Sequence, residues 1–264
     1  MKQDATGIVN KIAGSKKYNG IYIKTIEHIV KQCLERYDSR EAEKKARNIL
    51  HQIWGSYYTN KPDYSYLLDQ LRSDLRNDTD IRDAILKILP AQSSTRERIP
   101  LLGFFYEHIF SVTGYPDSII DHACGLNPLT IPWMNLPEST EYCAYDIDVC
   151  QIRFLNSVFN ILGLPQGINI GSGDVILDRF GYSDIVFMLK LLPPLEHQSK
   201  GSSLKIMQNQ ECRKMVISFP VKSLSGNEKG MAEFYSGWFI NLIKDKWKYK
   251  RLDFDTELVF IVEK

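Results

Sequence analysis

The spacing of apolar residues changes once along the chain. Through about residue 89, apolar side chains recur at intervals of three and four positions, as they do on one face of a helix. One such series is Ile26, Ile29, Val30, Cys33, Leu34 and Tyr37, and another is Ile81, Ala84, Ile85, Ile88 and Leu89. We therefore predict a helical N-terminal domain over residues 1–90.

Short apolar runs alternate with helical spacing after the proline-bounded segment "PAQSSTRERIP" at residues 90–100. The expected strands cover residues 118–122, 142–146, 168–170, 184–189, 215–219 and 257–262. Helical spacing marks residues 149–162 and 231–243. Strands that alternate with helices predict an α/β domain with a parallel sheet, here over residues 91–264.

Composition is that of an ordinary globular protein. The chain has 264 residues, of which 44% are hydrophobic and 25% charged, enough to form a full core. No apolar run reaches the roughly 18 residues that a membrane helix needs, and the first residues lack a signal-peptide pattern, so we expect a cytoplasmic protein. The five cysteines include no C-x-x-C pair, which argues against disulfides and against a zinc site.

Positive charge is concentrated near the N-terminus. Residues 1–61 contain 12 Lys and Arg against 6 Asp and Glu, a net charge of +6, although the whole chain carries only +1. Such a segment suits a polyanion such as RNA. A solvated face of an amphipathic helical region explains the charge equally well. If RNA does bind, the best candidates for contact are Lys16, Lys17, Lys45 and Arg47.

Ligands of parallel sheets bind beyond the carboxyl ends of the strands. Four expected strands end in or are followed by polar segments, "DHACGLNP", "AYDID", "GSGDV" and "FMLKLLPPLE". The first turn has a single glycine, Gly125, which disfavours a pyrophosphate site. Asp146, 21 residues later, could accept the hydroxyls of a ribose. The spacing favours an S-adenosylmethionine site, and a nucleotide or NAD site and plain strand-end turns remain alternatives.

Six segments resemble the aminoglycoside-resistance 16S rRNA methyltransferases of the Arm/Rmt type: "HQIWGSYY", "SSTRER", "DHACGLNPL", "AYDID", "LKLLP" and "SFPVKSLSGNEKGM". The resemblance implies a class I (Rossmann-like) methyltransferase fold behind a helical rRNA-docking domain. It also implies methylation of N7 of guanine 1405 in the decoding region of 16S rRNA, within the small ribosomal subunit, and aminoglycoside resistance. The alternatives are a methyltransferase of another RNA or of a small molecule, and a non-catalytic RNA-binding relative.

The resemblance also implies a set of residues that bind S-adenosylmethionine and its product S-adenosylhomocysteine: Tyr57, Ser94, Thr95, Arg98, Ala123, Gly125, Asp146, Asp174, Val175, Leu189 and Gln198. Among them, Arg98 would hold the methionine carboxylate, Asp146 the ribose and Asp174 the adenine amine. Arg98 could instead be a surface residue after a helix cap, and Tyr57 could be a core aromatic residue.

The implied reaction makes few chemical demands. Guanine N7 carries a lone pair and no proton, so methyl transfer to it needs no general base and depends mainly on positioning. We expect Lys222, Lys229 and Met231 to hold the target base, although Met231 could equally begin the core face of a helix. His122 receives no role, because a histidine on a strand flank is more often a core residue. No metal is expected.

Overall fold

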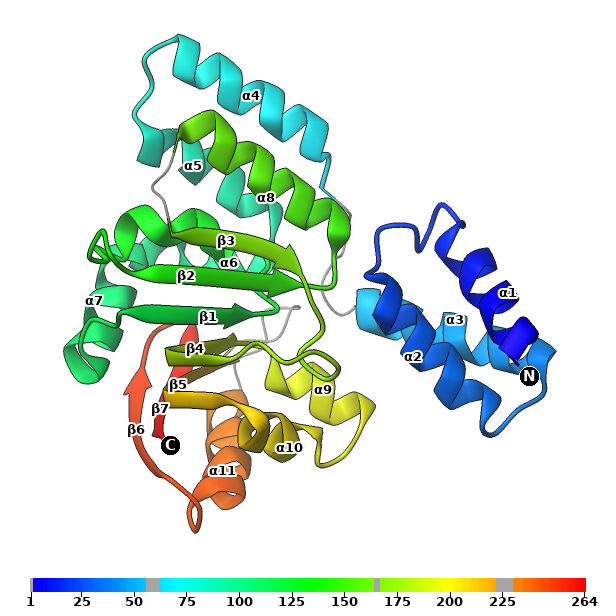
Figure 1. Ribbon diagram of the computed structural model, residues 1–264. Coiled ribbons are helices and arrows are strands. Elements are labelled where there is room, and N and C mark those ends of the chain that lie inside the picture. The colour runs from blue at the N-terminus through cyan, green and yellow to red at the C-terminus, as the bar shows by residue number, and fades with distance from the viewer. Residues whose placement is uncertain (1, 56–61, 164–166, 222–229) are drawn as a thin grey trace.

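A seven-stranded sheet forms the centre of the computed structural model, which describes residues 2–55, 62–163, 167–221 and 230–264 (Figure 1). The strand order is β3 (Ile168–Ser172), β2 (Glu141–Asp146), β1 (Ser118–His122), β4 (Tyr182–Leu189), β5 (Glu211–Pro220), β7 (Glu257–Glu263) and β6 (Lys248–Asp253). The first five strands are parallel, which confirms the predicted parallel sheet. The prediction is wrong for β7, which runs antiparallel to both of its neighbours because β6 leads into it through a tight turn.

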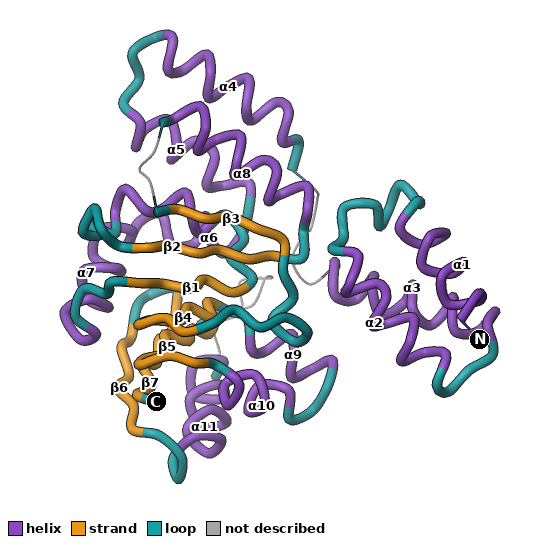
Figure 2. Tube along the Cα trace, viewed as in Figure 1, coloured by secondary structure: helices purple, strands orange, loops and turns teal. Residues whose placement is uncertain are grey.

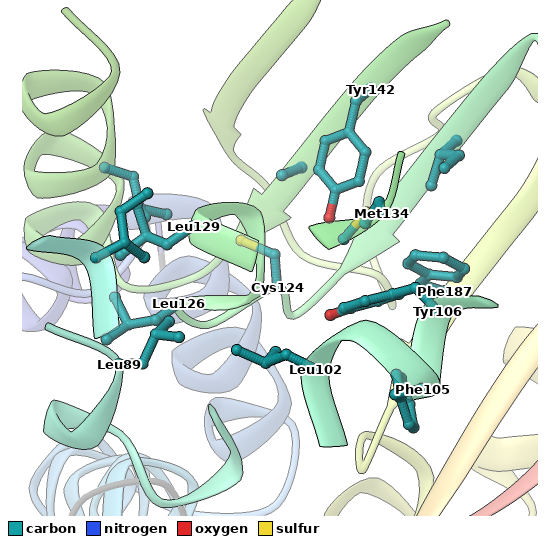
Figure 3. Close-up of a cluster of buried hydrophobic side chains, with 14 of the residues drawn as sticks. Leu89, Leu102, Phe105, Tyr106, Cys124, Leu126, Leu129, Met134, Tyr142 and Phe187 are labelled. Atoms are coloured by element: carbon teal, nitrogen blue, oxygen red, sulfur yellow. The ribbon is translucent and has the colours of Figure 1, made fainter. Parts of the chain in front are cut away.

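Side chains along each strand alternate between two cores, as the pleat of a strand requires. On β1, Ile119 belongs to one core and Ile120 to the other. The first core, part of which is drawn in Figure 3, packs against α5 (Ile81–Ile88), α7 (Leu102–Thr113) and α8 (Val149–Leu162). Helix α4 (Tyr64–Arg76) lies beside α8 (Figure 1). The second packs against α9 (Leu192–Gln198), α10 (Ser202–Asn209) and α11 (Met231–Ile243). The ranges predicted for α8 and α11 are confirmed residue for residue.

Aspartates at the N-caps explain where three helices begin. The side chains of Asp63, Asp80 and Asp148 accept hydrogen bonds from backbone amides in the first turns of α4, α5 and α8. These bonds satisfy amides that have no partner within the helix. Gly163 ends α8 in the left-handed conformation, which glycine adopts at little cost.

The edge strand β6 was not predicted from the sequence. Its segment "KYKRLD" has only Tyr249 and Leu252 partly buried, between four exposed charged residues. Charged edge strands protect a sheet against pairing with other chains, but they lack the apolar alternation by which a strand is recognised.

Three helices form a separate group on the side to which β1, β2 and β3 point (Figures 1 and 2). These helices, α1 (Lys2–Ala13), α2 (Ile23–Leu34) and α3 (Ser39–Gly55), share a core of their own that includes Ile12, Ile26 and Leu50. The predicted boundary at residues 90/91 does not coincide with the change from helices to strands, because α6 (Ser93–Arg98) and α7 still precede β1. The packing changes earlier, between α3 and α4, because α4 and α5 share the core of the sheet.

Short helical segments connect α5 to α7, and a further one follows β1. They are η1 (Leu89–Ala91), α6 (Ser93–Arg98), η2 (Ile99–Leu101) and η3 (Asn127–Trp133). Arg98, at the end of α6, and Glu257, at the start of β7, form an ion pair with side-chain exposures of 1% and 0%. Arg98 Nε donates to Glu257 Oε1 (2.9 Å), and Arg98 Nη1 donates to Asn127 Oδ1 (2.6 Å). Burial alone would raise the pKa of Glu257, but the charges of Arg98 and Lys190 hold it below its ordinary value.

The substitution Glu257→Gln is expected to lower the free energy of unfolding by about 3–5 kcal/mol, because it leaves the buried Arg98 charge without a counter-ion. Denaturation in urea measures this value. The matched control is Asp69→Asn, which breaks the exposed Arg72–Asp69 pair of 3.0 Å and should cost less than about 1 kcal/mol. Equal losses in the two variants would contradict a central role for the buried pair.

Candidate functional site

A cavity lies beyond the carboxyl ends of β1, β2, β3 and β4, where the sheet topology leads one to expect a ligand. Five of the residues predicted to bind the cofactor line the cavity: Ala123, Asp146, Asp174, Val175 and Gln198. Several further lining residues were not predicted from the sequence: Thr25, Ile53, Gln92, Gln151, Ile176, Leu191 and Leu195.

Asp146 ends β2, and its carboxylate is fixed by backbone amides. Its Oδ2 accepts a hydrogen bond from Gly125 N (3.0 Å), and its Oδ1 accepts one from Asp148 N (2.9 Å). Burial raises the pKa of Asp146 to about 6, although these amides favour the charged form. At neutral pH, the site therefore presents a rigid carboxylate that retains further lone pairs for a ligand.

The turn after β1 depends on two left-handed residues. Ala123 has φ 50° and Gly125 has φ 54°. A Cβ at Gly125 would lie only 2.4 Å from Oε1 of Gln92, and this same oxygen accepts a hydrogen bond from Leu126 N (2.6 Å). Glycine is thus required at 125 both by conformation and by close approach. Ala123 adopts the left-handed conformation despite its Cβ, at a cost of about 1–2 kcal/mol.

Asp174, which follows β3, connects the cavity to the N-terminal helices. Its Oδ2 accepts a hydrogen bond from Thr25 Oγ1 in α2 (2.7 Å), and its Oδ1 accepts one from Ile176 N (2.9 Å). Burial raises the pKa of Asp174, and the bond from Thr25 opposes this shift. Nearby, Lys24 pairs with Asp178 (2.8 Å). Helix α2 therefore forms a wall of the cavity, a long-range contact that spacing along the sequence could not predict.

The remaining walls are mostly apolar. Val175 and Ile176 follow β3, and Leu191 and Leu195 follow β4. Gln198, at the end of α9, adds an exposed amide. An apolar cavity with a few fixed acceptors suits a ligand that has a flat apolar part and several donor groups.

Other predicted cofactor residues lie away from the cavity wall. Arg98 is bonded to Glu257 and Asn127, and the hydroxyl of the buried Thr95 donates to Leu89 O (2.6 Å) and to Gln92 O (3.0 Å). Ser94 lies in the same helix, α6, which reaches the cavity through its N-cap residue Gln92. The structure therefore does not bring Ser94, Thr95 or Arg98, the residue expected to hold the methionine carboxylate, to the cavity wall.

Three further predicted positions have different settings. Gly125 supports the turn behind Ala123 without lining the cavity. Leu189, at the end of β4, packs against the first core. Tyr57 lies outside the described residues.

The candidate RNA-binding residues all belong to the group α1–α3 and the turns between these helices. Lys17 Nζ and the Arg47 guanidinium both lie over the ring of Tyr18, at 5.5 and 5.8 Å from its centroid. Arg47 also pairs with Glu43 (3.0 Å), and Lys45 Nζ lies 5.3 Å from the ring centroid of Tyr37. The remaining candidate, Lys16, is exposed. The four side chains are thus presented by one compact helical unit.

Of the residues predicted to hold the target base, the structure describes only Met231. It is half-buried at the start of α11, after Gly230, which has φ 80°. Lys222 and Lys229 lie outside the described residues.

The described residues contain no group of three or more His, Cys, Asp or Glu side chains that could hold a metal ion. Within the same part of the chain, no helix is both long and apolar enough to cross a membrane.

The sheet of this chain has five parallel strands next to the antiparallel strand β7, and carboxylates at the end of β2 and after β3 line one cavity. This arrangement is that of the class I S-adenosylmethionine-dependent methyltransferases. The family model described as "Ribosomal RNA methyltransferase (FmrO)" matches residues 14–261. The chain therefore belongs to this family of rRNA methyltransferases.

Curated relatives span almost the whole chain. A 16S rRNA (guanine(1405)-N(7))-methyltransferase of Micromonospora echinospora is 34% identical and covers 96% of this chain and 94% of its own length. The protein of the same name from Proteus mirabilis is 32% identical over 97% of this chain and 96% of its own.

Solved structures agree with this assignment. The 16S rRNA methyltransferase RmtF, crystallised with S-adenosyl-L-homocysteine, superimposes with a TM-score of 0.82 at 26% identity, covering 100% of this chain and 99% of its own. The 16S rRNA methylase ArmA is 34% identical, covers 77% of this chain and 99% of its own, and has a TM-score of 0.60.

Alanine at position 125 should be more harmful than alanine at another left-handed glycine. A Cβ at Gly163, which has φ 61°, would meet no atom within 4 Å, so Gly163→Ala should lower the free energy of unfolding by only about 1–2 kcal/mol. Gly125→Ala carries the same backbone cost and must also displace the amide of Gln92. Denaturant unfolding of both variants measures the difference, and equal losses would show that Gln92 moves aside freely.

Proposed function

We propose that this protein transfers the methyl group of S-adenosylmethionine to N7 of guanine 1405 in 16S rRNA and thereby gives resistance to aminoglycosides. The small ribosomal subunit would be its substrate, in the cytoplasm. The observation that supports this most is the cavity that unites Asp146 and Asp174 of the sheet with Thr25 of the basic helical group. The relatives from Micromonospora echinospora and Proteus mirabilis are named for that same reaction.

The cavity has the chemistry that this cofactor needs. Asp146 offers acceptor oxygens for ribose hydroxyls, Asp174 offers one for the adenine amine, and Val175 and Leu195 give apolar surface for the purine. Gln198 adds an amide at the exposed side. When bound, S-adenosylmethionine supplies a methyl group that its positive sulfur makes reactive.

Helix α6 affects cofactor binding indirectly, because its residues hold the turn after β1 in position. Thr95 holds the first turn of α6, Arg98 holds Asn127 at the start of η3, and Gln92 contacts the turn directly. We therefore assign Thr95 and Arg98 to positioning the turn, and Gln92 to the cavity wall.

Catalysis here consists of alignment. The N7 lone pair can attack the methyl carbon without losing a proton, so the protein has no proton to remove. The rate then depends on how well the cofactor and the base are held in line. In this scheme Met231, Lys222 and Lys229 position the target base.

Docking is the task of the helical group. Lys16, Lys17, Lys45 and Arg47 would contact rRNA phosphates, which position a protein on RNA without reading its sequence. Because Thr25 belongs to the same group, docking and the cofactor cavity share one structural unit.

The decisive experiment is to map the methylated nucleotide. Purified small subunits are incubated with the protein and S-adenosylmethionine, the rRNA is cleaved chemically at 7-methylguanine, and primer extension locates the cut. The expected result is a stop at guanine 1405 that disappears without cofactor. A stop elsewhere, or no transfer by a protein that binds the cofactor, would favour another RNA, a small molecule or a non-catalytic role.

The affinity of the protein for S-adenosylhomocysteine should fall as the pH is lowered from 7 to 5. The pKa of Asp146 is raised to about 6, so the carboxylate is ionised at pH 7 and gains a proton below pH 6, where it loses acceptor capacity. Asp146→Asn should bind more weakly at pH 7 by about 1–3 kcal/mol and should remove most of this pH dependence. Calorimetry across this range tests both points, with the exposed change Asp255→Asn as the control. A wild-type affinity independent of pH would exclude Asp146 as the acceptor.

Reversing charge in the helical group should weaken binding to the small subunit. The double substitution Lys16→Glu and Lys17→Glu is expected to reduce the slope of log affinity against log salt by about 1 for each phosphate that the variant no longer neutralises. The matched control makes the same charge change at Lys248 and Lys250 on the exposed edge strand β6. Filter binding at several salt concentrations measures the slopes. Equal effects of both pairs would indicate net charge alone, and a loss of cofactor affinity would indicate misfolding.

A further inference from the structure

His122, the last residue of β1, lines the cavity and has no part in the reaction described above. Its side chain is 1% exposed and lies on the side of the sheet that packs against α9 and α10. The ring of Phe180 approaches it edge-on, with 4.7 Å between the ring centroids. A polar side chain in this position must satisfy two ring nitrogens, one of which is a donor and the other an acceptor when the ring is neutral.

Gln210 fixes which nitrogen of His122 carries the proton. The amide nitrogen of Gln210 donates to Ile206 O (3.0 Å), so the amide oxygen faces His122 Nε2 (2.8 Å). An oxygen accepts, and Nε2 must therefore be the donor. Burial lowers the pKa of His122 to about 4, although Gln210 favours the charged form, so the ring is neutral at physiological pH. Nδ1 consequently presents a lone pair.

Nδ1 is buried and has no hydrogen-bond partner among the described residues. Such an acceptor normally finds a donor, because leaving it unpaired costs free energy. His122 lines the cavity already assigned to a ligand, and this ligand carries hydroxyl, amine and ammonium donors.

We propose that His122 is a cofactor-binding residue, whose Nδ1 accepts a hydrogen bond from an O–H or N–H group of S-adenosylmethionine. The inference rests on the proposed function. The strand order β3, β2, β1 brings Asp174, Asp146 and His122 to successive strands along one edge of the sheet. Asp174 and Asp146 are assigned to the adenine and the ribose, so His122 accepts from the ribose or from the ammonium of the amino-acid part. Gln210 is a positioning residue that keeps the proton on Nε2.

Two conservative substitutions separate the two nitrogens of His122. The amide oxygen of asparagine takes the place of Nδ1, so H122N keeps the acceptor and loses the bond to Gln210. The amide nitrogen of glutamine takes the place of Nε2, so H122Q keeps the bond to Gln210 and loses the acceptor. In the ligand-free protein only H122N loses a hydrogen bond, the one to Gln210, whereas H122Q loses only the proposed bond to the ligand. Thermal unfolding of both variants checks that each remains folded.

Calorimetry with S-adenosylhomocysteine is expected to show binding about tenfold weaker for H122Q and within about threefold of wild type for H122N. The same titrations with 5′-methylthioadenosine, which lacks the amino-acid part, identify the donor. A loss for S-adenosylhomocysteine alone assigns the ammonium, and a loss for both ligands assigns a ribose hydroxyl. Equal affinities of H122Q and H122N for S-adenosylhomocysteine would overturn the proposal.

Nitrogen-15 NMR of histidine-labelled wild-type protein gives a readout that a structural role would not move. Adding S-adenosylhomocysteine should shift the Nδ1 resonance of His122 towards that of a hydrogen-bonded acceptor, while Nε2 keeps its proton. An unchanged Nδ1 resonance in a protein saturated with S-adenosylhomocysteine would overturn the role of His122 and leave the proposed function intact. Failure of the wild-type protein to bind S-adenosylhomocysteine would instead overturn the proposed function.

Discussion

The burial of Arg98 with Glu257 is the constraint on which the site depends. Charges removed from water must be paired and hydrogen-bonded, so α6, β7 and η3 have to meet in one arrangement. The amide of Asn127 continues this network by donating to Asp121 Oδ2 (2.9 Å) at the end of β1. The turn between Asp121 and Asn127 is therefore fixed at both ends. The antiparallel strand β7, which lies away from the cavity, supplies the charge that holds this turn in place.

A second connection joins the helical group to the sheet by backbone hydrogen bonds. Tyr22 N donates a hydrogen bond to Ile147 O, and Val149 N donates one to Gly20 O; the donor–acceptor distance is 2.8 Å in both. Both bonds involve the turn between Asp146 and helix α8, so the segment that carries Asp146 also anchors the helical group. Displacing that group would open the cavity at Thr25 and would free the backbone beside Asp146. Under the proposed function, substrate docking and cofactor binding are therefore physically linked, since the same few contacts serve both.

The sequence predicted features that arise from local repetition and missed those that arise from distant contacts. Helix α8 and the parallel strands follow from apolar spacing, and Asp146 and Asp174 follow from their places after strands. Thr25 could not be predicted, because its part in the cavity depends on how α2 docks against the loop after β3. For Arg98, the family resemblance implied a residue that binds the cofactor carboxylate, whereas the structure pairs it with the buried carboxylate of Glu257. The guanidinium group of an arginine can bind a carboxylate of the protein as well as a carboxylate of a ligand. The position of the arginine in the sequence does not show which of the two it binds.

Two buried carboxylates, Asp146 in the cavity and Asp121 in the network with Asn127, are harder to ionise than an exposed aspartate. Burial raises the pKa of Asp121 and of Asp146 to about 6, well above the ordinary value of an aspartate. As the pH rises from about 4 to about 6, the unfolded chain releases these protons before the folded protein does, so the free energy of unfolding falls over this interval and stays lower at neutral pH. Donor groups of a ligand favour the ionised form of Asp146, and binding therefore returns its pKa towards the ordinary value. The buried carboxylates thus lower the stability of the folded protein, but Asp146 is already oriented to accept hydrogen bonds from a ligand. Binding of the cofactor restores part of the lost free energy of unfolding.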